Sequence, residues 1–391
     1  MIAKVINMCA IGSQRALFDI PEGVAYFNTA SNAPQLNASR ARLLEAAGAK
    51  SRPWERQPSD FFADAESIRR LAADLFGADA DAWAVIAAAS YGLSAAARAI
   101  EPTLKPGDRI LVMADEFPSN VLTWRRAAKQ TGATLTTVAT PADGDWTAAV
   151  LDEIRPGVRV VALSNCHWTN GALLDLAEIS AACRRIGAIL VLDVTQSLGA
   201  LPLDLATVDP DFMVTAGYKW LLCPYGFGLM YVAPRWRDAR PLEESWLGRA
   251  GAEDFANLVN YSDVYRPGAR RFDVGETCAP TILSGAIAAL EQLKAWGVAR
   301  IAESLKATTA RIAPELEAQG FGVLPATRRA PHMFGATLPD GHDGDVVGSL
   351  REQGVFVSRR GQSIRFSPHL HVTEADLAQL AAALKLAAAK R

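Results

Sequence analysis

The sequence predicts an α/β fold: a mostly parallel central sheet with helices on both faces, joined to a smaller α+β region at the C-terminal end. Short apolar runs alternate with helical patterns after about residue 80, and the pattern changes after Val232. A chain of 391 residues is also long enough to bury more than one core. Because strands that are covered on both faces are continuously apolar, these runs favour parallel strands.

Apolar runs of strand length define the predicted sheet. They are Trp83–Ala89, Arg109–Met113, Thr134–Val138, Val158–Leu163, Ala188–Asp193, Phe212–Thr215 and Gly228–Val232. Helical patterns lie between several of them, at Gly92–Ile100, Val121–Gln130 and Leu176–Ile186. Sheets of this kind place their chemistry at the carboxyl ends of the strands, so polar residues that follow these runs are the first candidates for a site.

The C-terminal part has a different pattern. Pro234–Gly275 is rich in Arg, Pro, Gly and Trp, which predicts irregular structure. Two helices are expected after it, at Ile282–Trp296 and Val298–Gln319. A small sheet is expected at Gly322–Pro325, Met333–Leu338, Val355–Ser358 and Ser363–Ser367, and a closing helix at Ala375–Lys390. We therefore predict an N-terminal segment over residues 1–35 that packs near the site, a large domain over 36–260 and a small α+β domain over 261–391.

Composition narrows the function classes. The net charge of −2 gives no reason to expect a nucleic-acid partner, and no apolar run reaches membrane-spanning length. The apolar stretch at the start is too short for a secretory signal. The five cysteines lack paired spacing, so we expect neither a disulfide framework nor a metal site, and we expect a cytoplasmic location.

Lys219 and Asp193 are the most informative residues. Asp193 ends one apolar run, and Lys219 follows another and is flanked by Tyr218 and Trp220. A buried amine and a buried carboxylate at neighbouring strand ends suggest a site for an aldehyde cofactor, with a Schiff base to the lysine and a ring nitrogen held by the carboxylate. Taken singly, Asp193 could instead cap a helix and Lys219 could extend along the surface.

Other residues extend this pattern. The sequence Ser90-Tyr91-Gly92 lies between a predicted strand and a predicted helix, where backbone N–H groups can bind a phosphate, although a serine there could equally be a helix cap. No P-loop is present, and the absence of a Gly-x-Gly-x-x-Gly after a strand disfavours a nicotinamide dehydrogenase.

These residues resemble the class V aminotransferase family of fold-type I pyridoxal-phosphate enzymes, which includes cysteine desulfurases, selenocysteine lyases, isopenicillin-N-epimerase-like proteins and kynureninases. The specific part is Asp193 and Gln196 followed by Lys219. The resemblance covers almost the whole chain, through Tyr26–Asn32, Glu116–Asn120, Ser164–Gly171, Arg271–Glu276 and Ile364–Asp376.

The resemblance implies a role for each matching residue around pyridoxal 5'-phosphate. Lys219 would carry the cofactor and move the proton at the substrate's α-carbon, and Asp193 would bind the ring nitrogen. Phe117 would stack on the ring, where desulfurases have a histidine, so proton transfer falls on Lys219 and on His167. The other implied cofactor contacts are Gln196 and Asn165 at the phenolic oxygen, and Ser90, Tyr91, Gly92, Tyr218 and Thr277 at the phosphate.

The substrate end is implied in the same way. Arg365 matches the arginine that binds the substrate's α-carboxylate, as its bidentate fork allows, although a surface ion pair would explain a lone arginine. Asn28, Ala30 and Asn32 would line the substrate pocket. Arg359, Arg360, Arg270, Arg271 and His332 could supply a second cationic group for an acidic substrate, or could be surface charges. Thr277 would reach the neighbouring subunit, so a homodimer with interfacial active sites is implied.

The implied function is conversion of a small amino acid through an external aldimine and a quinonoid. Desulfurases carry a nucleophilic cysteine on the loop before the arginine, but here Val355–Arg365 contains none, and no cysteine follows Cys278. We therefore expect aminotransferase-like or C–S/β-lyase chemistry without a persulfide. An amino-acid epimerase, or a non-catalytic protein that binds the cofactor and acts in regulation, are the alternatives.

Overall fold

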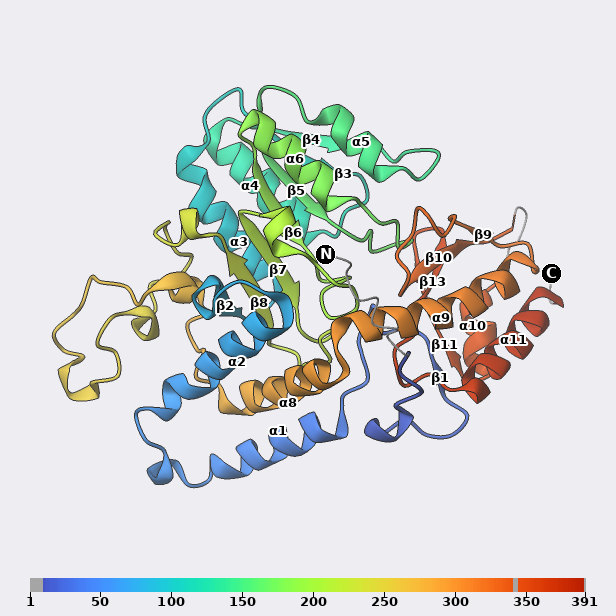
Figure 1. Cartoon of the computed structure of the whole chain (residues 1–391), viewed down its shortest axis with the longest axis horizontal. Helices are drawn as coiled ribbons and strands as arrows, with labels where there is room; N and C mark the ends of the chain where they lie inside the picture. The colour runs from blue at the N-terminus through green and yellow to red at the C-terminus, as the bar shows by residue number, and fades with distance from the viewer. Residues whose placement is uncertain (1–9, 340–343, 390–391) are drawn as a thin grey trace, which may run out of the picture.

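The computed structural model describes residues 10–339 and 344–389. Outside them lie residues 1–9 of the predicted N-terminal segment, which include Cys9, and residues 340–343, 390 and 391 of the predicted small domain, which include Lys390 at the end of the predicted closing helix. Figure 1 shows a large α/β unit and, at the other end of the long axis, a smaller unit built mainly from the chain after α8, which ends at Trp296.

A seven-stranded sheet forms the centre of the large unit, in the order β2-β8-β7-β6-β5-β3-β4. Only β8 runs antiparallel to its neighbours. The strands are β2 (Trp83–Ile86), β3 (Arg109–Met113), β4 (Thr134–Val138), β5 (Val158–Ser164), β6 (Ile189–Asp193), β7 (Phe212–Ala216) and β8 (Gly228–Val232). The predicted α/β class and mostly parallel sheet are therefore confirmed.

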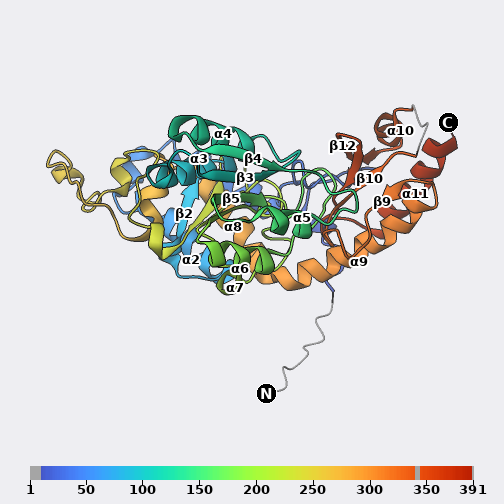
Figure 2. The same ribbon diagram turned by 90° about the horizontal axis from the view of Figure 1, so that it is seen from above.

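Alternate residues of the strands pack on opposite faces of this sheet. Val160 and Ala162 belong to the core beneath helices α3 and α4, whereas Val161 and Leu163 belong to the core beneath α2, α6 and α8. The views in Figures 1 and 2 show these helices on the two sides of the sheet. The helices of the large unit are α1 (Asn37–Ala49), α2 (Asp60–Phe76), α3 (Ala89–Ile100), α4 (Ser119–Thr131), α5 (Trp146–Glu153), α6 (Leu176–Ile186), α7 (Leu205–Val208) and α8 (Pro280–Trp296).

The smaller unit contains an antiparallel sheet in the order β12-β13-β10-β9 and a parallel pair, β1-β11. Its elements are β1 (Ala25–Tyr26), α9 (Val298–Glu317), β9 (Gly322–Val323), β10 (Phe334–Thr337), α10 (Val346–Glu352), β11 (Val355–Phe356), β12 (Ser358–Arg360), β13 (Ser363–Phe366) and α11 (Glu374–Ala389). Phe27 packs in the core of this unit with Phe334 and Phe366, whereas Phe18 and Ala30 pack in the core of the large unit, so the N-terminal segment contacts both. The domain boundaries at 35/36 and 260/261 remain predictions.

Two local expectations were wrong. The expected strand Trp83–Ala89 ends at Ile86, and α3 begins at Ala89 rather than Gly92, because Ala88 is already the extended residue that precedes the helix. The expected strand Val355–Ser358 is divided, since its first half pairs with β1 and Ser358 pairs with Arg365 of β13.

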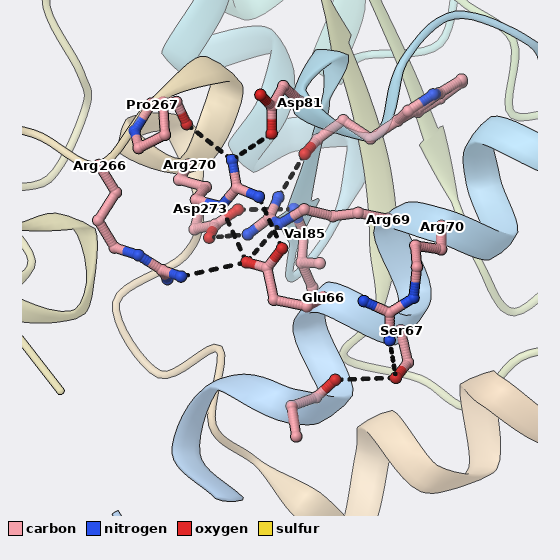
Figure 3. Close-up of polar contacts among 12 residues, drawn as sticks. Glu66, Ser67, Arg69, Arg70, Asp81, Val85, Arg266, Pro267, Arg270 and Asp273 are labelled. Carbon is pink, nitrogen blue, oxygen red and sulfur yellow. Dashed lines mark hydrogen bonds and ion pairs between the residues drawn. The ribbon is translucent and has the colours of Figure 1, made fainter. Parts of the chain in front are cut away.

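A buried ionic network attaches the segment before α8 to the sheet (Figure 3). Arg69 of α2 is 1% exposed and donates to the carbonyl of Trp83 and to the carboxylate of Asp273. Asp273 also accepts from the backbone N–H of Val85 at 2.8 Å. Because each buried charge has a partner of opposite sign, the network fixes residues 266–273 beside the edge strand β2.

Candidate active site

A pocket opens at the carboxyl ends of β3, β5, β6 and β7, where a parallel sheet exposes its strand ends. It encloses about 550 Å³, part of which is open solvent. The structure brings six predicted residues to its lining: Ser90, Phe117, Asp193, Gln196, Tyr218 and Lys219. They come from four separate parts of the sequence, which meet because the strands that precede them belong to one sheet.

Lys219 lies three residues after β7 and is 6% exposed. Burial, together with the positive charges of Arg365 and Arg360, lowers the pKa of its amine to about 8 against the opposing effect of the Asp193 charge. Its Nζ lies 5.6 Å from the centre of the Phe117 ring. A pKa near 8 leaves an appreciable fraction of free amine at neutral pH, which is the form that attacks a carbonyl.

Asp193 is the last residue of β6 and is 6% exposed. Its Oδ1 accepts from the backbone N–H of Thr195 at 3.0 Å, and no basic side chain within the described ranges lies within 4.0 Å of its carboxylate. Burial raises its pKa. A buried carboxylate that faces a pocket and forms no direct ion pair can be stabilised by an N–H donor on a bound ligand.

Gln196 and Asn165 are both held by protein groups. The Nε2 of Gln196 donates to the carbonyl of Ala30 at 3.2 Å, and its Oε1 accepts from the indole of Trp220 at 3.1 Å. The Oδ1 of Asn165 accepts from the Ser197 hydroxyl at 2.6 Å. Asn165 is buried beside the pocket and does not line it.

The predicted phosphate end is only partly assembled at the pocket. Ser90 lines it together with Ala88 and Ala89, at the first turn of α3, where helical N–H groups point outward. The Tyr91 hydroxyl instead donates to the carbonyl of Asp273 at 3.0 Å. A Cβ on Gly92 would lie 2.7 Å from Val214, so this glycine allows close contact between α3 and the sheet.

Tyr218 and Thr277 have different positions. Tyr218 lines the pocket and stacks on Tyr225, with ring centres 4.0 Å apart. Thr277 is buried ahead of α8 and is not among the residues that line the pocket of its own chain.

His167 does not point into the pocket. Its ring stacks on Trp146 at 5.3 Å, and its two nitrogens contact the Thr169 hydroxyl and the carbonyl of Ala114. Trp168, the next residue, lines the pocket and packs edge-to-face on Phe117 at 5.4 Å. The structure thus places an aromatic residue, rather than an imidazole, beside Phe117.

Arg365 lies on β13 and is 1% exposed. It donates to the carbonyl of Trp168 and to the Ser31 hydroxyl, both at 2.7 Å, and its Nε has no partner among the described residues. Burial, together with the positive charge of Arg360, lowers its pKa to about 9. An unpaired buried guanidinium near a pocket is suited to an anionic ligand.

The other predicted substrate contacts lie on the segment that crosses this region. Ala30 accepts from Gln196 and donates to the Ser367 hydroxyl at 3.0 Å. The Oδ1 of Asn28 is buried without a partner among the described residues, and the carbonyl of Asn32 accepts from the Tyr26 hydroxyl at 2.6 Å.

Glu116 is a pocket residue that the predicted set omits. It accepts from the backbone N–H groups of Phe117 at 2.8 Å and Ser164 at 3.0 Å. Burial, with a further contribution from Asp193, raises its pKa to about 7. Its position three residues after the apolar run of β3 makes it one of the polar residues that follow a predicted strand, the group in which site residues were expected.

Three buried histidines lie behind the pocket around Trp220. His332 contacts the carbonyl of Gln196 at 2.6 Å, and His371 contacts the carbonyl of Tyr26 at 2.8 Å. Neither ring nitrogen of His369 has a partner within the described ranges. Burial lowers their pKa values, to about 4 for His332 and His371 and about 3 for His369, so all three are neutral at pH 7.

Acid should therefore destabilise the fold through these histidines. Their folded pKa values lie below the unfolded value of about 6.5, so the unfolded chain binds more protons in this range and stability falls as pH drops from about 6.5 toward 4. We expect His369→Leu to reduce the loss of unfolding free energy between pH 7.5 and 5 by about 2 kcal/mol. Urea unfolding of the wild type and of His369→Leu, each at pH 7.5 and at pH 5, measures this difference in unfolding free energy.

Glu116 has the opposite pH dependence, but both proteins retain it, so its contribution cancels in the comparison. An equal loss of stability in the wild type and in His369→Leu would contradict a proton-linked role for His369.

This chain is similar in sequence and in fold to known proteins that use the same family of structures. The aminotransferase class-V family model matches residues 29–380. A probable cysteine desulfurase of Pyrococcus abyssi is 28% identical over 299 residues, which cover 75% of this chain and 72% of the other. Isopenicillin N epimerase of Streptomyces clavuligerus is 34% identical over 146 residues, 36% of each chain. A cysteine desulfurase structure from Thermococcus onnurineus shares the fold, with a TM-score of 0.83, 18% identity, and 98% and 100% of the two chains covered.

Proposed function

The chain belongs to the class V aminotransferase family of pyridoxal-phosphate enzymes, and we propose that it acts at the α-carbon of a small amino acid, by aminotransferase-like or lyase chemistry. The observation that carries this proposal is the meeting of Lys219 and Asp193 in one buried pocket.

The residues present are compatible with this cofactor. Asp193 is a buried carboxylate that forms no direct ion pair in the part of the chain that the structure describes, which suits the protonated nitrogen of a pyridine ring. Lys219 has a lowered pKa, which suits covalent attachment to an aldehyde. Ser90 and the first turn of α3 would hold the phosphate.

When bound, pyridoxal phosphate supplies an electron sink for negative charge at the substrate's α-carbon. The protein's own groups would do the rest. Arg365 would bind the α-carboxylate, Phe117 and Trp168 would shield one side of the pocket from water, and the Lys219 amine would accept and return the α-proton.

Borohydride reduction tests this assignment. We expect the purified protein to show the visible absorption of a lysine-bound cofactor and, after reduction, to carry the label on the peptide that contains Lys219. A label on another lysine, or no label after incubation with pyridoxal phosphate, would contradict the proposal.

Persulfide chemistry on the β12–β13 hairpin is not proposed. No cysteine follows Cys278 in the sequence, so this hairpin offers no thiol. Epimerisation is the second candidate because Glu116 lines the same pocket and can exchange a proton near pH 7. Incubation of a single enantiomer of the substrate in D₂O would distinguish epimerisation from transamination and lyase chemistry, because only epimerisation yields deuterated substrate of the opposite configuration.

We further propose a homodimer with active sites at the subunit interface. Supporting it are apolar side chains left exposed on the segment that projects from the large unit in Figures 1 and 2, namely Trp246, Phe255, Val259, Tyr261 and Val264. Light scattering should give twice the mass of the chain, and an active monomer would contradict the proposal.

Location is also a proposal. No helix within residues 10–339 and 344–389 is both long and apolar enough to cross a membrane. A cytoplasmic site of action remains a prediction from cysteine usage.

A further inference from the structure

Two guanidinium groups converge on one hydroxyl at the substrate end of the site. Nη2 of Arg360 donates to the Ser31 hydroxyl at 2.8 Å, and Nη2 of Arg365 donates to the same oxygen at 2.7 Å. The convergence follows from the β12–β13 register, in which Ser358 faces Arg365 and Arg360 faces Ser363. Directly opposed residues lie on the same face of a hairpin, so both arginines lie on one face.

The convergence leaves positive charge unbalanced. No acidic side chain among the described residues lies within 4.0 Å of either guanidinium. Burial is the main cause that lowers the pKa of each, and Arg360 also lowers that of Arg365. Ser31 offers one neutral oxygen to two cations, which does not offset their repulsion. The site therefore favours an incoming anion more strongly than a single arginine would.

The positive charges of Arg360 and Arg365 act on the Lys219 amine in the pocket. Arg365 and Arg360 both lower the pKa of the Lys219 amine, so they lie within electrostatic range of it. Arg360 uses one Nη1 bond on the carbonyl of Arg359 and one Nη2 bond on Ser31, which leaves further N–H groups for a ligand.

One carboxylate does not account for both arginines. A guanidinium fork occupies both oxygens of a carboxylate, so an α-carboxylate bound by Arg365 leaves Arg360 without a counterion. We propose that Arg360 and Arg365 together select amino acids that carry a second carboxylate on the side chain. This proposal rests on the proposed function and adds to it the class of substrate.

Arg359 provides a matched control. It lies on the opposite side of the same strand and is exposed, and its guanidinium donates to the hairpin turn, at the carbonyl of Gly361 and the side chain of Gln362. Replacing Arg359 removes the same charge from the same strand without altering the contacts to Ser31.

The experiment compares ligand pairs that differ in one charge. The holoenzyme is titrated spectroscopically with aspartate against asparagine and glutamate against glutamine. We expect the wild type to bind the acid at least about tenfold more tightly than its amide in one pair, as a charge-assisted hydrogen bond allows. Arg360→Gln should abolish this preference, Arg360→Lys should retain part of it, and Arg359→Gln should leave it unchanged.

A second measurement does not depend on turnover. Succinate should raise the melting temperature of the holoenzyme more than its monoamide succinamate does, and Arg360→Gln should remove the difference. Equal affinity of the wild type for acid and amide, or an equal loss for both in Arg360→Gln, would overturn the two-cation site. The two-cation site can fail while the proposed function remains supported: in that case borohydride still labels Lys219 and amino acids still shift the absorption spectrum of the cofactor. An unlabelled Lys219 overturns the proposed function itself.

Discussion

Lys219→Ala is expected to reduce turnover by about 10⁴-fold or more, since it removes both the covalent attachment point and the group that moves the α-proton. The physical basis is the lowered pKa of the amine, which burial and two nearby guanidinium groups hold at about 8. Stopped-flow or steady-state rates with the best amino acid from a broad panel would measure the loss.

The fold should tolerate this change. Lys219 makes no ion pair within 4.0 Å in the described part of the chain, so its removal breaks no direct charge contact and takes away only a longer-range attraction to Asp193. Lys129→Ala, at an exposed position near the end of α4, is the matched control and should keep full activity. Turnover within tenfold of the wild type in Lys219→Ala, at equal cofactor content, would contradict the assignment.

Much of the sheet could be predicted because its strands are buried on both faces. All five residues of β6 are buried, so its sequence is an uninterrupted apolar run before Asp193. Helices α1 and α2 were not predicted. In α1 only Ser39 is buried, and the small, polar and charged residues around it give no apolar stripe that would mark a helix in the sequence.

The site was predictable where it depends on strand ends. Lys219, Asp193 and Gln196 meet because parallel strands end at the same edge of the sheet. The direction of a side chain is a different matter. His167 follows a strand as they do, yet it stacks on Trp146, and the residue that turns into the pocket is Trp168. The packing of the surrounding chain decides which of two adjacent residues, His167 or Trp168, points into the pocket.

Arg360 shows a second limit of sequence reasoning. Arg359, Arg360, Arg270, Arg271 and His332 were equal candidates for a second cation, but Arg270 is bound by Glu66 and Asp81 in the network of Figure 3, and Arg271 by Asp238. His332 is buried against Gln196 and neutral. Long-range pairing therefore singles out Arg360, which no local pattern could do.

Asp193→Asn is expected to lower turnover by about 10² to 10³-fold while the protein still binds the cofactor, because the change removes a charge and keeps the shape of the side chain. The carboxylate is buried and has no basic side chain within 4.0 Å in the described part of the protein, so in the native enzyme its oxygens are available to a ligand. An amide in the same place can accept a hydrogen bond from a ring nitrogen but cannot stabilise its positive charge.

Asp193→Glu is the conservative variant that separates charge from packing. It restores the carboxylate with one extra methylene, so it should recover part of the turnover lost in Asp193→Asn even if it disturbs the Thr195 contact. If packing at this strand end were what mattered, Asp193→Glu would be the more damaged of the two, because the longer side chain must fit beside β7. Rates and cofactor content measured on both variants distinguish these outcomes, and turnover in Asp193→Asn equal to that of the wild type would exclude a role for the charge.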